Sequence, residues 1–318
     1  MDLSKLINKA AEQPQAEAAA QQTPKEEYAA LKKAEREDAW ARVDATAEAV
    51  FKDGASMQAW LDFAAACTPQ STRNLLILYN QNPAIRHPRT FDKWKEAGRS
   101  VLAGAAGYTF FAEQRYTRED GTPATGYALV KAFDISQTRG PQPAAETPRE
   151  PEELLAALIE QSPVRLELSD QLPDKVQAQY VPAQHTIFVR NNMEAGTAFC
   201  AIAREQAHAS FDTVGRGYTR QAFAAQSYCA AYIAAKKFGI DTSAFRFDKV
   251  CELGTGLDTQ SKRSFLSDVK SAAYTVSRGI RRSFREMEQM IQPDAFPVAD
   301  QPRLAKAKAE KSRDAGSR

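Results

Sequence analysis

The chain has 318 residues, 43% hydrophobic and 26% charged, which is typical of a soluble globular protein long enough for two domains. Its 42 Lys and Arg residues nearly balance its 40 Asp and Glu residues, so the net charge of +2 alone indicates no partner. The four cysteines form no CxxC pair, which excludes a disulfide framework. Residues 1–22 lack the apolar core of a signal peptide, and no apolar run has transmembrane length. We therefore expect a cytoplasmic protein that does not bind a membrane.

The first 38 residues are rich in Ala, Gln, Glu and Lys and contain few large apolar side chains. Such a segment buries too little surface to offset its ordering entropy, so residues 1–38 are predicted to be a disordered or loosely helical tail. Apolar residues recur at helical spacing from Ala39, and a second helical pattern follows Gly54. Residues 71–83 begin with capping residues, continue as an apolar helix and end at a proline.

Residues 91–101 have the pattern of a short helix that ends near Gly98. Residues 107–116 and 126–136 have the composition of two strands, joined by a turn rich in Gly, Thr and Asp. These elements predict an α+β domain over residues 39–138.

Residues 139–151 contain four prolines and almost nothing to bury, which is typical of a stiff interdomain linker. The second predicted domain, 152–292, opens with a helix and continues with strands at 164–170 and 179–191. Two helices follow, one containing residues 198–212 and one rich in alanine, and the chain beyond Phe245 is again helical. Residues 293–318 are predicted to be a disordered charged tail.

The helix over 198–212 has the layout of the zinc-protease motif HExxH, but it reads REQAH. Glu205 and His208 occupy the places of the general base and the second ligand, whereas Arg204 replaces the first histidine. Arginine offers zinc no lone pair and adds a repelling charge. The downstream helix offers Gln226 or Tyr228 where a third-ligand carboxylate is needed, and a neutral amide is a poor zinc ligand.

Two strands followed by two helices is the order of elements in a minimal zincin core. The sequence therefore predicts a vestigial site at Arg204, Glu205, His208 and Gln226 that holds no metal, with Arg204 paired to Glu205. A rescued zinc site, in which Cys200, Cys229 or Asp212 replaces the lost ligands, is the alternative. In a third interpretation, His208 is an ordinary half-buried histidine and ExxH is a chance match.

Several stretches resemble the ArdC family of plasmid and conjugative-element proteins, including its LtrC-like branch. They are NLLILYNQNP, FDKWKEAGRSVLAGAAG, VKAFDISQTRG, AIAREQAH and QSYCAAYIAAKKFGIDTSAF, and the likeness runs from about Ala39 to about Met290. The resemblance implies a single-stranded-DNA-binding domain followed by a zincin-like metallopeptidase domain, and a role in protecting incoming DNA from restriction. The chain departs from the family at Arg204, at Gln226 or Tyr228, and at residues 104–107, where GAAG replaces a basic turn.

Two regions have the charge expected of a nucleic-acid interface. Between residues 73 and 118, cations are interleaved with aromatic rings, which suits binding of phosphates and unpaired bases. Residues 262–286 form a predicted amphipathic helix with one cationic face. In the plainer interpretation, most of the aromatic rings, including Trp94, belong to the core. The cations of residues 262–286 then form only a solvated helix face. The predicted DNA contacts are Arg73, Arg86, Arg89, Lys93, Arg99, Tyr108, Phe110, Arg115 and Tyr116 in the first region, and Lys262, Arg263, Lys270, Arg278, Arg281, Arg282 and Arg285 in the second.

The favoured hypothesis is thus a single-stranded-DNA-binding protein of a mobile element, with a catalytically inactive zincin-like domain that acts as a scaffold or a surface for a protein partner. An active zinc metallopeptidase with unusual ligands is one rival. The other is a protein-interaction module that does not bind nucleic acid.

Overall fold

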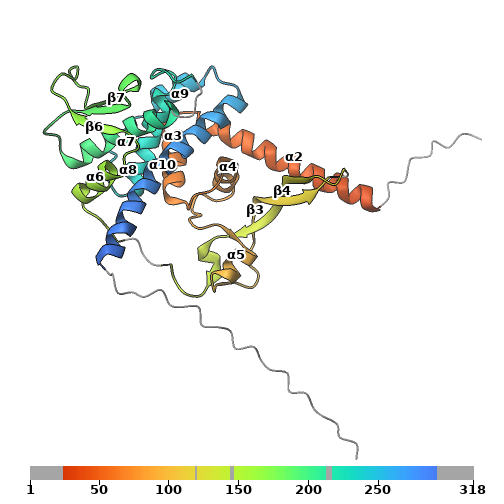
Figure 1. The fold of residues 1–318 in the computed structure, drawn as a ribbon. Coiled ribbons are helices and arrows are strands. Elements are labelled where there is room, and N and C mark those ends of the chain that lie inside the picture. The colour runs from red at the N-terminus through yellow and green to blue at the C-terminus, as the bar shows by residue number, and fades with distance from the viewer. Residues whose placement is uncertain (1–23, 119, 144–146, 213–216, 292–318) are drawn as a thin grey trace, which may run out of the picture.

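A computed structural model describes residues 24–118, 120–143, 147–212 and 217–291 (Figure 1). The first half contains α2 (Pro24–Val50), α3 (Gly54–Ala66), α4 (Thr72–Gln81), β1 (Arg89–Thr90), α5 (Phe91–Glu96), β2 (Ser100–Val101), β3 (Tyr108–Thr117), β4 (Pro123–Phe133) and β5 (Thr138–Arg139). The second half contains α6 (Pro151–Glu160), β6 (Arg165–Leu168), β7 (Ala178–Val181), β8 (Thr186–Val189), α7 (Ala195–Asp212), α8 (Ala224–Lys237), α9 (Asp248–Gly254) and α10 (Thr259–Ile291). The α+β class is confirmed. None of the described helices combines the length and the apolar character needed to cross a membrane.

Helix α2 crosses the boundary expected at residue 38 without a break. Residues 27–38 are exposed, whereas Ala39 and Val43 are buried. The apolar residues from Ala39 onward therefore anchor the helix, and the good helix formers Ala, Glu and Lys extend it into solvent. Of the predicted N-terminal tail, residues 24–38 are thus helical, and residues 1–23 lie outside the described part. The predicted C-terminal tail also lies outside it.

The two predicted strands of the first half are confirmed as an antiparallel hairpin of β3 and β4, with Phe111 opposite Leu129. Helix α4 lies along the outer edge of β3 and supplies the hydrogen bonds that another strand would make. The Asn74 amide bonds both the N–H and the C=O of Phe111, each at 2.9 Å. The Gln81 amide bonds both backbone groups of Thr109 in the same way. The two side-chain amides thus pair with backbone groups of Phe111 and Thr109 at the edge of β3.

The larger hydrophobic core joins the two halves of the chain. It combines Trp60 and Leu76 of α3 and α4 with Tyr232 of α8 and Leu266 of α10, all fully buried. Helix α10 packs against α2, α4, α6, α7 and α8, and so spans both halves (Figure 1). The larger core therefore crosses the predicted boundary between residues 39–138 and 152–292. The two halves share this core because α10, the last helix, packs against α2 and α4 of the first half.

A second core lies under a three-stranded sheet of order β6-β8-β7, in which β6 and β8 are parallel and β7 is antiparallel to β8. Phe199 and Ile202 of α7 pack here with Tyr180 of β7 and Ile187 of β8. This packing places the polar residues of α7 beside the free edge of β7.

Candidate metal centre and cationic groove

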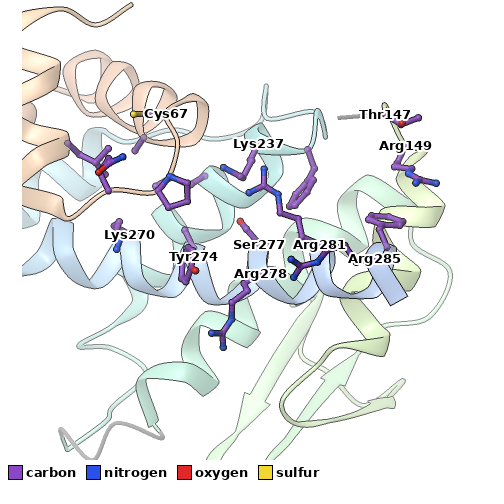
Figure 2. Close-up of a pocket in the computed structure, with 18 of the residues that line it drawn as sticks. Cys67, Thr147, Arg149, Lys237, Lys270, Tyr274, Ser277, Arg278, Arg281 and Arg285 are labelled. Atoms are coloured by element: carbon purple, nitrogen blue, oxygen red, sulfur yellow. The ribbon is translucent and has the colours of Figure 1, made fainter. Parts of the chain in front are cut away.

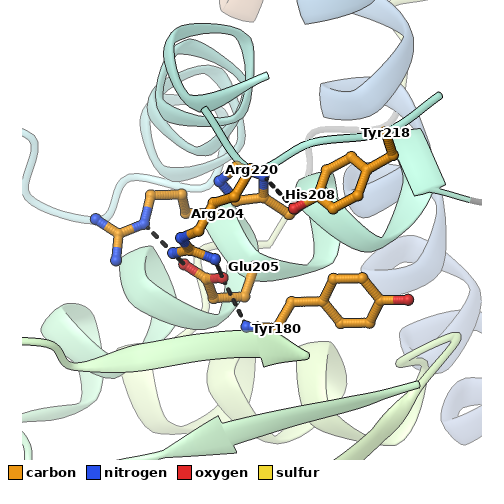
Figure 3. A network of polar contacts seen from close by, with 6 residues as sticks. All are labelled: Tyr180, Arg204, Glu205, His208, Tyr218 and Arg220. Carbon is orange, nitrogen blue, oxygen red and sulfur yellow. Dashed lines mark hydrogen bonds and ion pairs between the residues drawn. The ribbon is translucent and has the colours of Figure 1, made fainter. Parts of the chain in front are cut away.

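Helix α7 brings Glu205 to the edge of β7, where its side chain is completely buried. One carboxylate oxygen accepts the backbone N–H of Tyr180 at 2.8 Å, and the other accepts Nε of Arg204 at 3.1 Å (Figure 3). The Arg204–Glu205 pair predicted from the sequence is therefore present. Arg204 remains about one-third exposed, since its side chain has a relative exposure of 32%.

A second arginine, Arg220, also binds the carboxylate of Glu205. Arg220, in the turn before α8, donates from Nη1 and Nη2 to the two oxygens of Glu205 at 2.6 and 2.8 Å. Burial alone would raise the pKa of Glu205, but the hydrogen bonds and charge of Arg220, helped by Arg204, outweigh it and hold that pKa below its usual value. The carboxylate is therefore an anion bound by two guanidinium groups.

His208 is buried one turn further along α7, and its Nδ1 lies 3.0 Å from the Tyr218 hydroxyl. Burial lowers the pKa of His208 to about 4, and the charges of Arg220 and Arg204 act in the same direction, while Glu205 opposes them. Burial also raises the pKa of Tyr218 to about 12. The imidazole is thus neutral at pH 7 and pairs with a neutral phenol.

These residues do not fit a zinc ion. Both oxygens of Glu205 are bound to Arg220, and two positive charges lie where a divalent cation would have to sit. Among the residues that the structure describes, no three His, Cys, Asp or Glu side chains are grouped so as to hold a metal. The charges and contacts of these side chains therefore support no metal-dependent step at this site.

The proposed substitute ligands are unsuited to zinc as well. Cys200 is half-buried and Cys229 is fully buried, and neither belongs to a group of three potential ligands within the described residues. Asp212 accepts the Tyr180 hydroxyl at 2.8 Å. Gln226 is half-buried on α8, and its neutral amide is a poor zinc ligand.

A cationic groove of about 590 Å³ lies between α10, the C-terminal end of α8, the loop from α3 to α4, and residues 147–149 (Figure 2). Its floor is apolar and includes Leu75, Ile233 and Ala273. Glu288 is the carboxylate among the described lining residues, and it is bound to Arg149 at 3.1 Å. The cations on its walls are Arg149, Lys237, Lys270, Arg278, Arg281 and Arg285.

The comparisons with known proteins give similarity in fold only. No protein-family model matches the chain, and no curated protein matches it. The metal-free crystal structure of the antirestriction ArdC protein from the R388 plasmid has a TM-score of 0.47 and 18% identity, over 76% of this chain and 98% of that one. The Mn(II)-bound structure of the same protein has a TM-score of 0.48 and 17% identity, over 75% and 97%.

The groove gathers four of the cations predicted as DNA contacts, namely Lys270, Arg278, Arg281 and Arg285. The others on α10 lie elsewhere. Lys262 forms an ion pair with Glu48 of α2, and Arg263 forms one with Asp44 at 2.9 Å, so both fasten α10 to α2. Arg282 faces outward and pairs with Glu286 at 3.4 Å.

The first predicted DNA-binding region is only partly available. Arg99 is buried and donates to Thr138, Gly140 and Pro141, so its prediction as a DNA contact is wrong: it fastens the chain after β5. Arg99 is buried because its guanidinium binds Thr138 of β5 and the chain that follows it. Tyr108 and Phe110 are half-buried and pack against the larger core, so their role as DNA contacts stays a prediction.

The remaining residues of this region are more accessible. Arg115 and Tyr116 are exposed near the tip of the hairpin, and Arg115 has an exposed side-chain fraction of 90%. The others occur in local contacts: Arg86 with the carbonyls of Pro83 and Ile85, Arg89 over the Trp94 ring, Lys93 with Glu96, and Arg73 among the rings of Trp40, Phe111 and Tyr127.

Sequence reasoning missed Arg220, Tyr218, Arg149 and Lys237. The sequence held a weak signal for Arg220, because a buried carboxylate in a motif without its metal needs a cation as partner. Only Arg204 was predicted as the partner of Glu205. Arg149 and Lys237 carried no signal, since they lie in the linker and at the end of α8, and only the fold brings them to α10.

Proposed function

We propose that this chain binds single-stranded DNA in the cationic groove, and that its zincin-like half has no peptidase activity. The observation that carries the proposal is the convergence of cations from three segments on one groove: Arg149, which pairs with the lining carboxylate Glu288, and five others, Lys237, Lys270, Arg278, Arg281 and Arg285. Cations that converge on one groove create a positive potential that attracts a polyanion.

The shape of the groove supports an extended ligand. Lys270 and Arg285 lie 15 residues apart on α10, which corresponds to roughly 22 Å at the rise of an α-helix. Lys237 and Arg149 come from other segments that line the same groove. A row of cations of this length along an apolar floor suits several consecutive phosphates, with bases against the floor.

The ion pairs of Glu205 with Arg204 and Arg220 support the absence of peptidase activity. A metallopeptidase needs a carboxylate free to take a proton from metal-bound water. In this chain the carboxylate of Glu205 is bound to Arg220 and Arg204. The site then acts as a structural link between α7, β7 and the turn before α8.

The DNA-binding proposal is tested by fluorescence anisotropy with a labelled oligothymidylate over a salt series. The double variant Arg278→Gln/Arg285→Gln removes two groove cations. The control Arg282→Gln/Lys249→Gln removes two exposed cations outside the groove, one of them on the same helix. Loss of two phosphate contacts should reduce the slope of log K against log salt by about 1.4. Equal loss in both double variants would mean that total charge, and not the groove, drives binding.

The cellular role we propose is protection of incoming DNA from restriction, as the motifs NLLILYNQNP and FDISQT suggest through their resemblance to ArdC. Cells that carry a restriction system and express the chain should accept unmodified plasmid DNA more efficiently than cells without it. The Arg278→Gln/Arg285→Gln variant should lose this gain. If it keeps the full gain, protection does not depend on the groove.

A further inference from the structure

Tyr274 lies on α10 within the groove, one helical turn after Lys270 and one before Arg278 (Figure 2). The residue is 43% exposed, whereas Phe265, Leu266, Val269, Val276 and Ile280 of the same helix are buried. Nζ of Lys270 lies 5.6 Å from the ring centroid, and Cζ of Arg278 lies 6.0 Å from it. The ring thus has a cation on each side along the helix.

The two other aromatic rings of the groove are already engaged. Phe238 is half-buried and packs on the smaller core. Phe284 packs on the same core and carries the guanidinium of Arg149 over its ring, at 4.6 Å from the centroid. Within the described lining, Tyr274 is therefore the aromatic side chain with an exposed surface to offer a ligand.

The spacing fits a planar base. A base sandwiched between the Tyr274 ring and the Arg278 guanidinium needs two stacking steps, about 6.8 Å in total. The ring and the guanidinium carbon are 6.0 Å apart, so a shift of the exposed arginine side chain by about 1 Å would admit the base. The flanking phosphates would then reach Lys270 on one side and Arg278 or Arg281 on the other.

We infer that Tyr274 stacks on an unpaired base and makes the groove selective for single strands over duplexes. This inference rests on the proposed function of the groove. In a duplex the base faces are stacked on neighbouring bases, so the ring finds no partner, although the phosphates still attract the cations. Tyr274 therefore determines specificity, and the arginines and lysines supply charge that both kinds of DNA can use.

The test compares Tyr274→Leu and Tyr274→Phe with the wild-type chain, using an oligothymidylate and a duplex of equal length. Stacking of one base contributes a factor of roughly 5 to 150 in affinity. Tyr274→Leu should therefore lower single-strand affinity by at least fivefold and change duplex affinity by less than about twofold. Tyr274→Phe keeps the ring and should retain single-strand affinity.

Tyr28→Leu is the matched control. Tyr28 is an exposed tyrosine on α2 with Lys32 one turn away, its Nζ 5.7 Å from the ring centroid, and it lies outside the groove. This variant should bind both ligands as the wild type does. Melting temperatures of all variants show whether each is folded.

The outcomes separate the two proposals. If the wild type binds neither DNA in a salt-dependent way, the proposed function fails. If it binds through the groove but Tyr274→Leu behaves as Tyr28→Leu does, the stacking inference alone is overturned. The inference is also overturned if Tyr274→Leu weakens single-strand and duplex binding equally, because the ring would then only position Lys270 and Arg278.

Discussion

Arg220 binds both carboxylate oxygens of Glu205, at 2.6 and 2.8 Å, and the carboxylate is fully buried. The residue that would act as general base in a metallopeptidase is therefore an ion-pair partner. A buried carboxylate is costly unless it is paired and hydrogen-bonded. Arg220, Arg204 and the Tyr180 N–H together meet that requirement without a metal.

Replacement of Arg220 by methionine should destabilise the fold strongly, because it leaves a buried anion with one partly exposed cation. We expect the free energy of unfolding at pH 7 to fall by about 3–5 kcal/mol, measured by urea denaturation. Glu205→Gln in the same chain should recover part of the loss, since it removes the unpaired charge. Arg165→Met, which breaks an exposed ion pair with Glu167, should cost less than about 1 kcal/mol. Equal losses in Arg220→Met and Arg165→Met would contradict the structural role.

Stability should decline as the pH falls from 6.5 to about 4, because His208 is buried in its neutral form. The folded pKa of about 4 lies below the ordinary 6.5, so the unfolded chain binds the proton first in this window. The full contribution, about 3 kcal/mol, is present above pH 6.5. The groups around the imidazole are Glu205, Arg204, Arg220 and Tyr218. The pKa of Glu205 is also lowered in the folded chain. The stability that Glu205 contributes is therefore lost only as the pH falls below about 4.5.

His208→Gln should flatten the pH dependence between 6.5 and 4 and leave the loss at lower pH. Urea midpoints measured at half-unit intervals give the comparison. An unchanged profile in the variant would show that another group titrates in this window.

Local patterns were enough to predict the longer helices and strands but not the two-residue strands β1, β2 and β5, nor the contacts that position the elements. The helix over residues 72–81 follows from its apolar run and from Ser71, whose hydroxyl accepts the N–H of Asn74 as an N-cap. The side chain of Asn74 gave no such signal. It closes the edge of β3 at Phe111, 37 residues away, and only the fold shows this.

The same limit applies to the candidate site. The Arg204–Glu205 pair was predictable, since its members are adjacent in the chain. Arg220 reaches Glu205 because the turn before α8 folds back on α7. On α10, periodicity identifies the buried face, but it does not show that Lys262 and Arg263 form ion pairs with α2. Lys262 pairs with Glu48, 214 residues earlier, and no local pattern relates the two.

Zinc should not stabilise the wild-type chain. A site with a dissociation constant one hundredth of the free zinc concentration would add about 2.7 kcal/mol to the stability. We expect no shift of the melting temperature, because Arg220 holds the carboxylate and Arg204 offers no lone pair. Arg204→His/Arg220→Ser should show a zinc-dependent shift, since it places two imidazoles four residues apart on α7 and frees Glu205. A shift in the wild type that His208→Gln abolishes would restore the metallopeptidase hypothesis.

Lys262 and Arg263 should matter for stability and not for DNA affinity. Both form ion pairs with α2, and their side chains are only 12% and 30% exposed. The hydrogen bond from Lys262 lowers the pKa of Glu48, as expected of a formed pair. Lys262→Met/Arg263→Met should lower the free energy of unfolding by about 0.2–1 kcal/mol for each pair. The affinity for oligothymidylate should change less than twofold, although the variant loses as much positive charge as Arg278→Gln/Arg285→Gln. A loss of affinity equal to that of the groove variant would mean that DNA contacts the N-terminal end of α10 as well, where the sequence alone had placed it.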